Sequence, residues 1–207
     1  MAVGGVRRPF SLAMLLLAIT GGVGMGKSSA GEHLRRAGVP VVDTDALARK
    51  ESGQGSPAFQ EIVGLFGLGV VGADGELNRG RLAEIVFNDA AARKQLEACL
   101  HPRIASAWRS QVDDWRRRET PVAAVSIPLL FEKGYEQDFD SVICLACSAK
   151  TQSQRLGQRG WSGEQIRARN AAQLPVSEKM NRAHRVIWTE GSMDAHLRQW
   201  DRILPRA

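Results

Sequence analysis

Short apolar runs recur along the chain, and longer stretches with helical spacing of apolar residues separate them. The first run is almost continuously apolar over residues 12–20, which is typical of a strand buried on both faces of a parallel sheet. Strands that alternate with helices imply βαβ units, so the sequence predicts an α/β fold with a parallel sheet. The five expected strands span residues 12–20, 39–43, 121–127, 139–146 and 184–188.

The interval between the second and third expected strands has a helical pattern. Its roughly 75 residues are too many for a plain crossover connection, so we expect a separate helical lobe. Pro102 suits the first turn of the helix whose apolar stripe begins at Ile104. The tryptophans of this interval are expected in a core rather than as platforms for stacking bases, because they follow helical spacing. The apolar stripes are Phe59, Ile62, Val63 and Phe66, and Ile104, Trp108, Val112 and Trp115.

The interval between the fourth and fifth expected strands predicts two short helices that project from the sheet as a lid. Ser148 and Ser162 suit N-cap positions, and Gln165 completes a capping box with Ser162. The interval is strongly basic, because residues 150–185 contain eight Lys or Arg and two Asp or Glu, which equals the net charge of +6 of the whole chain. Basic surfaces often bind nucleic acid, but a polyphosphate ligand would use the same charge.

The length and composition of the chain are typical of a single globular domain. A chain of 207 residues can bury a core and suits one α/β domain with small inserted lobes. No stretch reaches the roughly 18 apolar residues that a membrane span needs. The run Arg7-Arg8-Pro9-Phe10 resembles a twin-arginine export signal, but the apolar run after it is expected as the first strand. We therefore predict a cytoplasmic protein with about ten leading residues outside the fold.

The cysteines predict neither a disulfide framework nor a metal centre. The chain has three, and Cys144 and Cys147 form a C-x-x-C pair. A structural zinc site needs four ligands, and the sequence offers no second pair. Cys144 is expected in a buried strand and Cys147 near its end, so a redox or metal role is the weaker interpretation.

The most informative motif follows the first expected strand. The pattern G-x-x-x-x-G-K-[ST] describes a loop that cradles a nucleotide triphosphate, and residues 21–28 match it with Gly-Gly-Val-Gly-Met-Gly-Lys-Ser. Glycines let main-chain N–H groups turn toward phosphate oxygens, Lys27 supplies charge to the β- and γ-phosphates, and Ser28 can ligate Mg²⁺. The helix expected over residues 27–37, ended by Gly38, points its positive N-terminus at the same anion. A glycine-rich turn that binds nothing is the weaker alternative.

Two acidic residues follow the second expected strand. Asp43 and Asp45 lie at the end of residues 39–43, at the edge where ligands bind in an open α/β sheet. Phosphoryl transfer to a hydroxyl needs a group that accepts the proton, and Asp45 can be that base, with Asp43 orienting it or holding a metal-bound water. Asp45 can also cap a helix that begins there. Position alone leaves both interpretations open.

The other strand ends favour a kinase that acts on a small molecule. The third and fourth expected strands end without Asp or Glu, where motor ATPases and GTPases carry a Walker-B aspartate. Lid arginines can stabilise the transferring phosphoryl group once water is excluded. Arg155 and Arg159 are four residues apart, as are Arg169 and Gln173, which predicts one helix face for each pair. A solvated basic surface is the alternative for these side chains.

Further motifs follow the P-loop along the chain. They are Val41-Val42-Asp43-Thr44-Asp45, Gly55-Ser56-Pro57-Ala58, Phe87-Asn88, Leu100-His101-Pro102-Arg103-Ile104, Ile127-Pro128-Leu129-Leu130-Phe131-Glu132, Arg169 with Gln173, and Val186-Ile187. Together with the P-loop they resemble the motifs of the dephospho-coenzyme A kinase family over about residues 14–200. Many kinases share the P-loop, whereas the other matches are more specific.

The resemblance implies phosphorylation, by ATP with Mg²⁺, of the ribose 3′-hydroxyl of dephospho-coenzyme A, the last step of coenzyme A biosynthesis. It implies a three-layer P-loop kinase fold with a five-stranded parallel sheet, a helical coenzyme-A-binding lobe and a helical lid. The core would span about residues 12–45, 119–147 and 183–207, the lobe about 46–118, and the lid about 148–182. ATP and dephospho-coenzyme A are the expected partners, without nucleic acid or membrane, and the expected state is a monomer or small homo-oligomer.

The resemblance also assigns site residues. The implied catalytic residues are Lys27, Asp45, Arg155 and Arg159, and the implied metal ligand is Ser28. The implied ATP-binding residues are Gly22, Gly24, Met25, Gly26, Lys27, Ser28 and Ser29. The implied substrate-binding residues are Asp45, His101, Arg103 and Gln173.

The chain departs from the family pattern near the expected adenine position. The family usually has Asp near Cys147, Asp at the place of His184, and Asp-Asn at the place of Trp188-Thr189. These departures bear on nucleotide affinity or base preference more than on phosphate chemistry. Three alternatives stay open: a nucleoside monophosphate kinase, a nucleotide-dependent binding protein without phosphoryl transfer, and a nucleic-acid binder. The last is disfavoured because the positive charge is confined to the expected lid.

Overall fold

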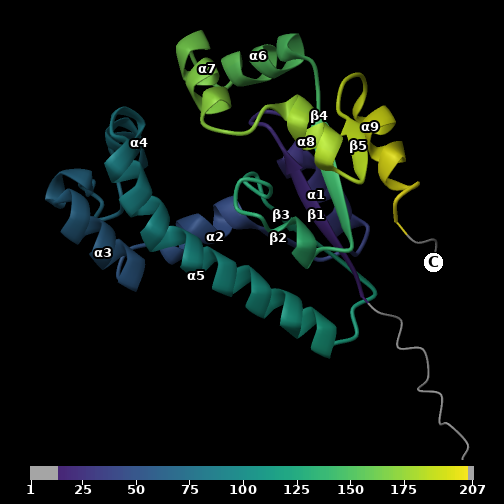
Figure 1. The fold of residues 1–207 in the computed structure, drawn as a ribbon, viewed down its shortest axis with the longest axis horizontal. Coiled ribbons are helices and arrows are strands. Elements are labelled where there is room, and N and C mark those ends of the chain that lie inside the picture. The colour runs from purple at the N-terminus through teal and green to yellow at the C-terminus, as the bar shows by residue number, and fades with distance from the viewer. Residues whose placement is uncertain (1–13, 205–207) are drawn as a thin grey trace, which may run out of the picture. The chain divides into compact units, whose positions relative to one another are not determined.

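Five strands form one sheet in the spatial order β2-β3-β1-β4-β5 (Figure 1). The computed structural model describes residues 14–204. The strands are β1 (Leu15–Gly21), β2 (Val41–Asp43), β3 (Val122–Ser126), β4 (Ser141–Ala146) and β5 (Arg185–Trp188). The predicted α/β class and all five predicted strands are confirmed. Residues 12–13 of the first expected strand and the motif at residues 7–10 lie outside the described residues.

The position of β1 explains where its following loop lies. β1 pairs in parallel with β3 on one side and with β4 on the other, and β4 pairs in parallel with β5. The register sets Ile19 opposite Ser126 and Gly21 opposite Leu145, close to the ends of β3 and β4. Parallel strands end at the same edge of a sheet, so β1 delivers the P-loop to the carboxyl edge, where ligands bind in such folds.

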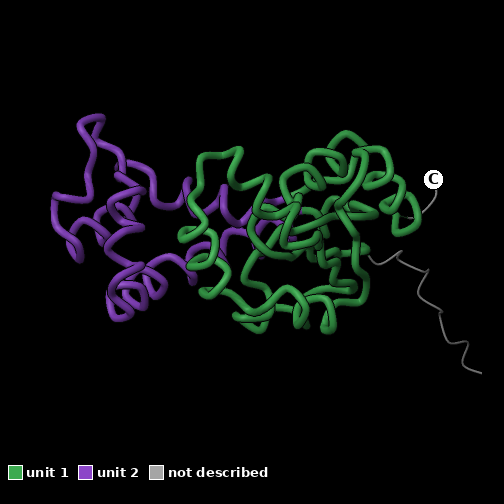
Figure 2. The backbone as a smooth tube through the Cα atoms, turned by 90° about the horizontal axis from the view of Figure 1, so that it is seen from above, with its two compact units in different colours: residues 1–41, 115–207 green, residues 42–114 purple. Residues whose placement is uncertain are grey.

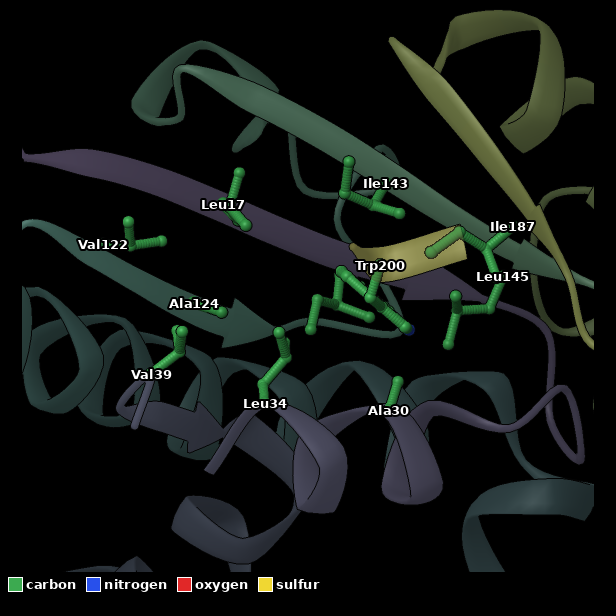
Figure 3. Close-up of a cluster of buried hydrophobic side chains, with 11 residues drawn as sticks. Leu17, Ala30, Leu34, Val39, Val122, Ala124, Ile143, Leu145, Ile187 and Trp200 are labelled. Carbon is green, nitrogen blue, oxygen red and sulfur yellow. The ribbon is translucent and has the colours of Figure 1, made fainter. Parts of the chain in front are cut away.

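Two helices far apart in the sequence contribute to the core on one face of the sheet (Figure 3). They are α1 (Lys27–Arg36) and α9 (Met193–Trp200). Alternate strand residues share a face, so Leu17 and Ile143 join the same cluster as Leu34 of α1 and Trp200 of α9. Trp200 is completely buried, and burial of one large apolar side chain stabilises the fold by about 2–3 kcal/mol.

Helix α1 ends as the sequence predicts. Ala37 is its C-cap, and Gly38 follows with a φ of 79°. The Gly38 N–H donates to the carbonyl of Arg35 at 3.0 Å, and the Val39 N–H donates to the carbonyl of Leu34 at 2.9 Å. A residue with a side chain would be strained at this left-handed position, which is why glycine ends the helix there.

The segment between β4 and β5 contains three helices rather than the two expected. They are α6 (Ala149–Gly157), α7 (Gly163–Ala171) and α8 (Val176–Arg182). The N-caps Ser148 and Ser162 are confirmed, because their hydroxyls accept from the N–H groups of Thr151 and Gln165. The capping box of α7 is also present. The expectation of two helices is wrong because the pattern after Pro175 was too short to reveal a further helix.

Helix α8 packs on the sheet instead of projecting from it. It contacts β1 and β4, and the side chain of Lys179 has no exposed surface. The Lys179 ammonium donates to the carbonyl of Pro128 at 2.6 Å and lies 2.8 Å from Oε1 of Glu132. The charge of Lys179 is therefore neutralised inside the protein and does not belong to a basic surface.

Residues 42–114 form a second compact unit with a core of its own (Figure 2). It contains α2 (Thr44–Glu51), α3 (Pro57–Phe66), α4 (Arg79–Asn88) and the larger part of α5 (Ala90–Arg117). Ile62 is fully buried, and Phe59, Val63 and Phe66 pack against the same cluster. The helical character predicted for this interval is thus confirmed. The buried members are Ala58, Ile62, Val70, Leu77, Leu82 and Cys99.

Pro102 lies inside α5 and not in its first turn, so that expectation is wrong. A proline inside a helix donates no hydrogen bond, and its ring crowds the carbonyl of the preceding turn. In that turn, the Arg103 guanidinium donates to the carbonyl of Cys99 at 2.5 Å. Trp108 and Trp115 are buried on α5, as their spacing predicts. Within residues 14–204, no helix combines the length and apolar character required to cross a membrane.

Candidate active site

The backbone of the P-loop requires glycine at its closest contacts. Gly21 has a φ of 135°, and a Cβ there would lie 2.3 Å from the carbonyl oxygen of Leu145. Gly24 has a φ of 73°, and a Cβ there would lie 2.9 Å from the side chain of Leu156 on α6. Side chains at these positions would therefore push the loop away from β4 and α6. Close packing therefore requires glycine at positions 21 and 24, in addition to the role of these glycines in exposing main-chain N–H groups.

The Lys27 side chain reaches back to the first residues of the P-loop. Its ammonium donates to the carbonyls of Gly21 and Gly22, both at 2.8 Å. The buried side chain of Met25 lies beneath Gly22, with its sulfur 3.0 Å from the place of a Cβ at that glycine. The charge is thus held close to the N–H groups that would receive phosphate oxygens.

The start of α1 suits an anion. Its N-cap is Gly26, with a left-handed φ of 87°, so no side chain caps the first N–H groups of the helix. These N–H groups and the helix dipole favour a phosphate. Ser28 and Ser29 are exposed in the first turn. A single hydroxyl such as that of Ser28 fits a Mg²⁺ ion whose other ligands are phosphate oxygens and water. Within residues 14–204, no cluster of three or more His, Cys, Asp or Glu could hold a metal ion.

Gln152 links α6 to the P-loop, and no sequence motif indicates this contact. The side chain is 4% exposed, and its Nε2 donates to the carbonyl of Val23 at 2.8 Å. The amides of Gln152 and Asn170 also donate to each other, at 3.1 and 3.0 Å, which joins α6 to α7. Neither apolar periodicity nor charge distinguishes Gln152 from the other polar residues of α6, so only the fold reveals this contact.

Arg155 lies against the loop that follows β5. Its Nη1 donates to the Thr189 hydroxyl at 2.9 Å, and its Nη2 donates to the Thr189 carbonyl. Thr189 is 3% exposed, and its Cγ2 lies 3.4 Å from the place of a Cβ at Gly26. One side of Thr189 thus receives Arg155 and another packs next to the P-loop. The departure from the family pattern at Thr189 therefore lies beside the phosphate loop itself.

The prediction that Arg155 and Arg159 share a helix face is wrong. Helix α6 ends at Gly157, and the Arg159 N–H bonds to the carbonyl of Leu156 in the turn beyond it. Glycines at 157 and 160 favour this end, and Gly160 has a φ of 81°. Arg159 is exposed.

The pairing of Arg169 with Gln173 on one helix face is wrong for the same reason. Helix α7 ends at Ala171, and Gln173 lies beyond it with its N–H bonded to the carbonyl of Asn170. The Arg169 guanidinium instead lies over the Trp161 ring, 5.5 Å from its centroid. The charged residue of the pair thus contacts an aromatic ring inside the same segment.

The structure decides which aspartate caps α2. The carboxylate of Asp43 accepts from the N–H of Asp45 at 2.9 Å, so Asp43 is the N-cap. Asp45 is the second residue of the helix and is exposed. The alternative in which Asp45 is the cap is therefore wrong, because Asp45 lies within the helix, two positions after the N-cap. A carboxylate in the first turn is also favoured by the helix dipole.

The expected substrate residues of α5 have acidic neighbours within the second unit. Arg103 donates to Oε2 of Glu61 on α3 at 2.7 Å, an ion pair that joins two helices of this unit. His101 lies with its Nε2 3.5 Å from Oε2 of Glu97, one turn earlier on α5. The structure therefore gives Arg103 a structural contact that the sequence did not predict.

The three cysteines are buried and show no pairing. Burial raises the pKa of the Cys144 thiol to about 11, although Lys179 and Lys27 oppose this effect. Burial likewise raises the pKa of Cys147 and of Cys99. The thiolate is the reactive form, so raised pKa values make these cysteines poor nucleophiles and metal ligands. The C-x-x-C pair therefore lacks the properties of a redox site.

His184 has a structural contact in the sheet. Its Nδ1 accepts from the N–H of Val142 at 2.9 Å, at the start of β4. The His184 side chain thus links the start of β4 to the segment that leads into β5. This departure from the family pattern is at the opposite end of β4 from the P-loop, because Gly21 faces Leu145.

Comparison with known proteins identifies the family of this chain. A family model described as dephospho-CoA kinase matches residues 15–195. The chain belongs to the dephospho-CoA kinase family. A dephospho-CoA kinase of Symbiobacterium thermophilum is 42% identical over 183 residues, which cover 87% of this chain and 76% of the relative. A dephospho-CoA kinase of Geobacillus kaustophilus is 36% identical over 197 residues, 91% of this chain and 98% of the relative.

A solved structure supports the fold of this family member. A crystal structure of a Thermus thermophilus protein has a TM-score of 0.77 and 36% sequence identity, and the match covers 92% of this chain and 96% of that one. The resemblance to dephospho-CoA kinases that the sequence motifs indicate is thereby confirmed, and so is the P-loop kinase fold.

Proposed function

We propose that the protein transfers the γ-phosphoryl group of ATP to the ribose 3′-hydroxyl of dephospho-CoA and releases CoA and ADP. Membership of the dephospho-CoA kinase family supports this reaction. The observation that carries the proposal is the P-loop, whose Lys27 ammonium lies at the carbonyls of Gly21 and Gly22 beside an α1 N-terminus without a side-chain cap.

In this proposal the P-loop binds the phosphates of ATP. Its main-chain N–H groups, from Gly22 through Ser29, receive phosphate oxygens, and Lys27 leaves its carbonyl partners to neutralise the β- and γ-phosphates. Glycines 24 and 26 and Met25 keep the loop in shape. A Mg²⁺ ion bound with ATP would be held by the Ser28 hydroxyl and would neutralise phosphate charge. Stabilisation of the charge on the transferring group is the main contribution of such a site.

Asp45 is the proposed base that accepts the proton of the 3′-hydroxyl. Its exposed position in the first turn of α2 and the separate capping role of Asp43 support this role. Because Asp43 satisfies the helix N-terminus, the Asp45 carboxylate is not required for capping. His101, Arg103 and Gln173 are proposed to contribute to the acceptor site, with Arg103 exchanging part of its contact with Glu61 for a substrate phosphate.

Arg155 and Arg159 are proposed to stabilise the phosphoryl group during transfer. An arginine carries five N–H donors, and two contacts from Arg155 to Thr189 leave further donors for a phosphate. Arg159 would act only after movement of the turn that follows α6. The reaction would occur in the cytoplasm, without nucleic acid or membrane, and in a monomer or small homo-oligomer.

A coupled assay of ADP formation tests the proposal. The purified protein is given ATP and Mg²⁺ with dephospho-CoA or, separately, with each of a panel of nucleoside monophosphates. Turnover with dephospho-CoA is expected. Turnover with a nucleoside monophosphate alone would overturn the proposal, and so would tight ATP binding with no transfer to any acceptor.

A further inference from the structure

The carboxylate of Glu190 is surrounded by donors from two parts of the chain. Its Oε1 accepts from the Ser148 N–H at 3.0 Å, from the Thr151 hydroxyl at 2.5 Å, and from the Ser148 hydroxyl. Its Oε2 accepts from the indole N–H of Trp188 at 3.0 Å. Glu190 follows β5, whereas Ser148 and Thr151 belong to the start of α6.

These contacts add an external cap to α6. Ser148 already caps the helix, and its hydroxyl accepts from the Thr151 N–H at 3.2 Å. Glu190 brings a negative charge to the same end, where the helix dipole and unpaired N–H groups favour an anion. The hydrogen bonds from Ser148 and Thr151 lower the pKa of Glu190 to about 2. The carboxylate therefore stays charged at any pH at which a kinase would be assayed.

Thr189, the residue before Glu190, makes a second contact with α6. Thr189 receives the Arg155 guanidinium through its hydroxyl and its carbonyl. Thr189 is itself fixed by its N–H, which donates to the carbonyl of Ala146 at the end of β4 at 2.8 Å. Two consecutive residues after β5 thus hold α6 at its first turn and again at Arg155. We call Thr189 and Glu190 the α6 clamp.

The part of α6 between these two contacts reaches the P-loop. Gln152 follows Thr151 directly, and its amide donates to the Val23 carbonyl at 2.8 Å. Leu156 of the same helix packs against Gly24. A shift of α6 at its first turn would therefore move Gln152, Arg155 and the support of the P-loop together.

We propose that Glu190 is a positioning residue for phosphoryl transfer, which fixes α6 so that Gln152 and Arg155 keep their places beside the P-loop. The proposal rests on the proposed kinase function. Glu190 itself need not touch either substrate, since it acts through the helix. Misplacement of a phosphate site by about 1 Å can cost up to 100-fold in rate, so loss of this contact should be visible in kinetics.

The test compares Glu190→Ala with Glu190→Gln and with Ser192→Ala. Glu190→Gln keeps an acceptor oxygen for Ser148 and Thr151. Ser192→Ala removes the N-cap of α9 in the same loop, where the hydroxyl accepts from the Ala195 N–H at 3.2 Å, and leaves α6 untouched. Tm, kcat and the KM values for ATP and dephospho-CoA are measured for each variant at a temperature well below Tm.

Glu190→Ala is expected to lower kcat/KM for ATP about tenfold, while KM for dephospho-CoA changes less than about twofold. Glu190→Gln should recover most of the loss. Ser192→Ala should lower Tm by an amount similar to Glu190→Ala and keep kcat/KM within about twofold of the unmodified protein. If Glu190→Ala lowers Tm alone and leaves the kinetics unchanged, Glu190 is only a stabilising residue and the proposal is wrong.

A further variant and a binding measurement cover the cases in which Glu190→Ala does not fold or the protein is inactive. If Glu190→Ala does not fold, Thr151→Val removes one donor to the carboxylate and must lower kcat/KM for ATP in the same direction, or the proposal fails. If the unmodified protein does not phosphorylate dephospho-CoA, the proposed function fails, and the clamp is judged by affinity for a non-hydrolysable ATP analogue. Glu190→Ala must then weaken that affinity more than Ser192→Ala does.

Discussion

The side-chain amide of Gln152 donates a 2.8 Å hydrogen bond to the main-chain carbonyl of Val23. The contact joins α6 to the centre of the P-loop, because Val23 lies between two of its glycines. The buried amide also exchanges two hydrogen bonds with Asn170 on α7. The segment after β4 is therefore attached to the phosphate site by a polar side chain, and not only by contacts of its arginines with a ligand.

Replacement of Gln152 by Ala should weaken both the fold and nucleotide binding. The change leaves the Val23 carbonyl without this donor, which costs about 1–3 kcal/mol of unfolding free energy. Asn170→Ala is the matched control, because it removes the exchange with α7 and keeps the bond to Val23. Denaturant unfolding and binding of a non-hydrolysable ATP analogue should show a larger effect for Gln152→Ala. Equal effects of the two variants would mean that the Val23 contact contributes nothing.

Lys27→Ala should lower kcat by a factor of about 100–1,000 or more, because it removes charge stabilisation of the transferring phosphoryl group. The fold should persist, since the bonds of the ammonium to the carbonyls of Gly21 and Gly22 stay within one loop. Steady-state kinetics measures the loss. Lys150→Ala, which removes the same charge from an exposed position on α6, is the control and should leave kcat unchanged. A comparable loss in both variants would point to general electrostatics rather than to Lys27.

Asp45→Asn should lower kcat much more than it changes the KM for ATP, because it removes the proposed base and keeps the shape of the side chain. Glu51→Gln also converts a carboxylate to an amide, at the other end of α2, and should leave kcat nearly unchanged. Asp43→Ala should instead lower the unfolding free energy by about 1 kcal/mol, as loss of an N-cap does. An unchanged kcat in Asp45→Asn would exclude Asp45 as the base.

Stability should fall in mild acid because of His196. Burial lowers the pKa of this histidine, with Arg155 and His33 acting in the same direction. The side chain is 3% exposed, and its Nε2 has no hydrogen-bond partner. Below the unfolded pKa of about 6.5, the unfolded chain takes up a proton that the folded chain does not, so stability is lost as pH falls.

His196→Leu tests this linkage, because it keeps the volume approximately and removes the titrating group. Chemical unfolding at pH values from 8 to about 5 should show a weaker decline of stability in the variant than in the unmodified protein. The two curves should diverge only below the unfolded pKa of histidine. Parallel curves over the whole range would assign the acid sensitivity to other groups.

The sequence predicts the sheet well because its strands are buried. The run at residues 15–19 is apolar throughout, and Leu17, Ala18 and Ile19 prove to be fully buried in β1, which lies between β3 and β4. The P-loop is also predictable, since local backbone shape demands glycine there. These features depend on residues that are neighbours in the sequence, and periodicity and motif spacing describe such neighbours directly.

The contacts around the site could not be predicted, because they join residues far apart in the sequence. Lys179 counts as a surface charge by sequence, but in the structure it is buried and paired with Glu132. Arg159 has helical spacing from Arg155, yet α6 ends at Gly157 before it. The contacts of Gln152 with Val23 and of Glu190 with Ser148 span 129 and 42 positions. No local pattern marks polar residues whose partners are brought to them only by the fold.

Identification of the phosphorylated product tests the central claim most directly. The protein is incubated with ATP, Mg²⁺ and dephospho-CoA, and the product is analysed by mass spectrometry and by phosphorus NMR. The account predicts that dephospho-CoA gains one phosphoryl group on its ribose 3′-oxygen and that an equal amount of ADP forms. Protein that binds ATP and leaves dephospho-CoA unmodified, or that phosphorylates it at another position, would contradict the account.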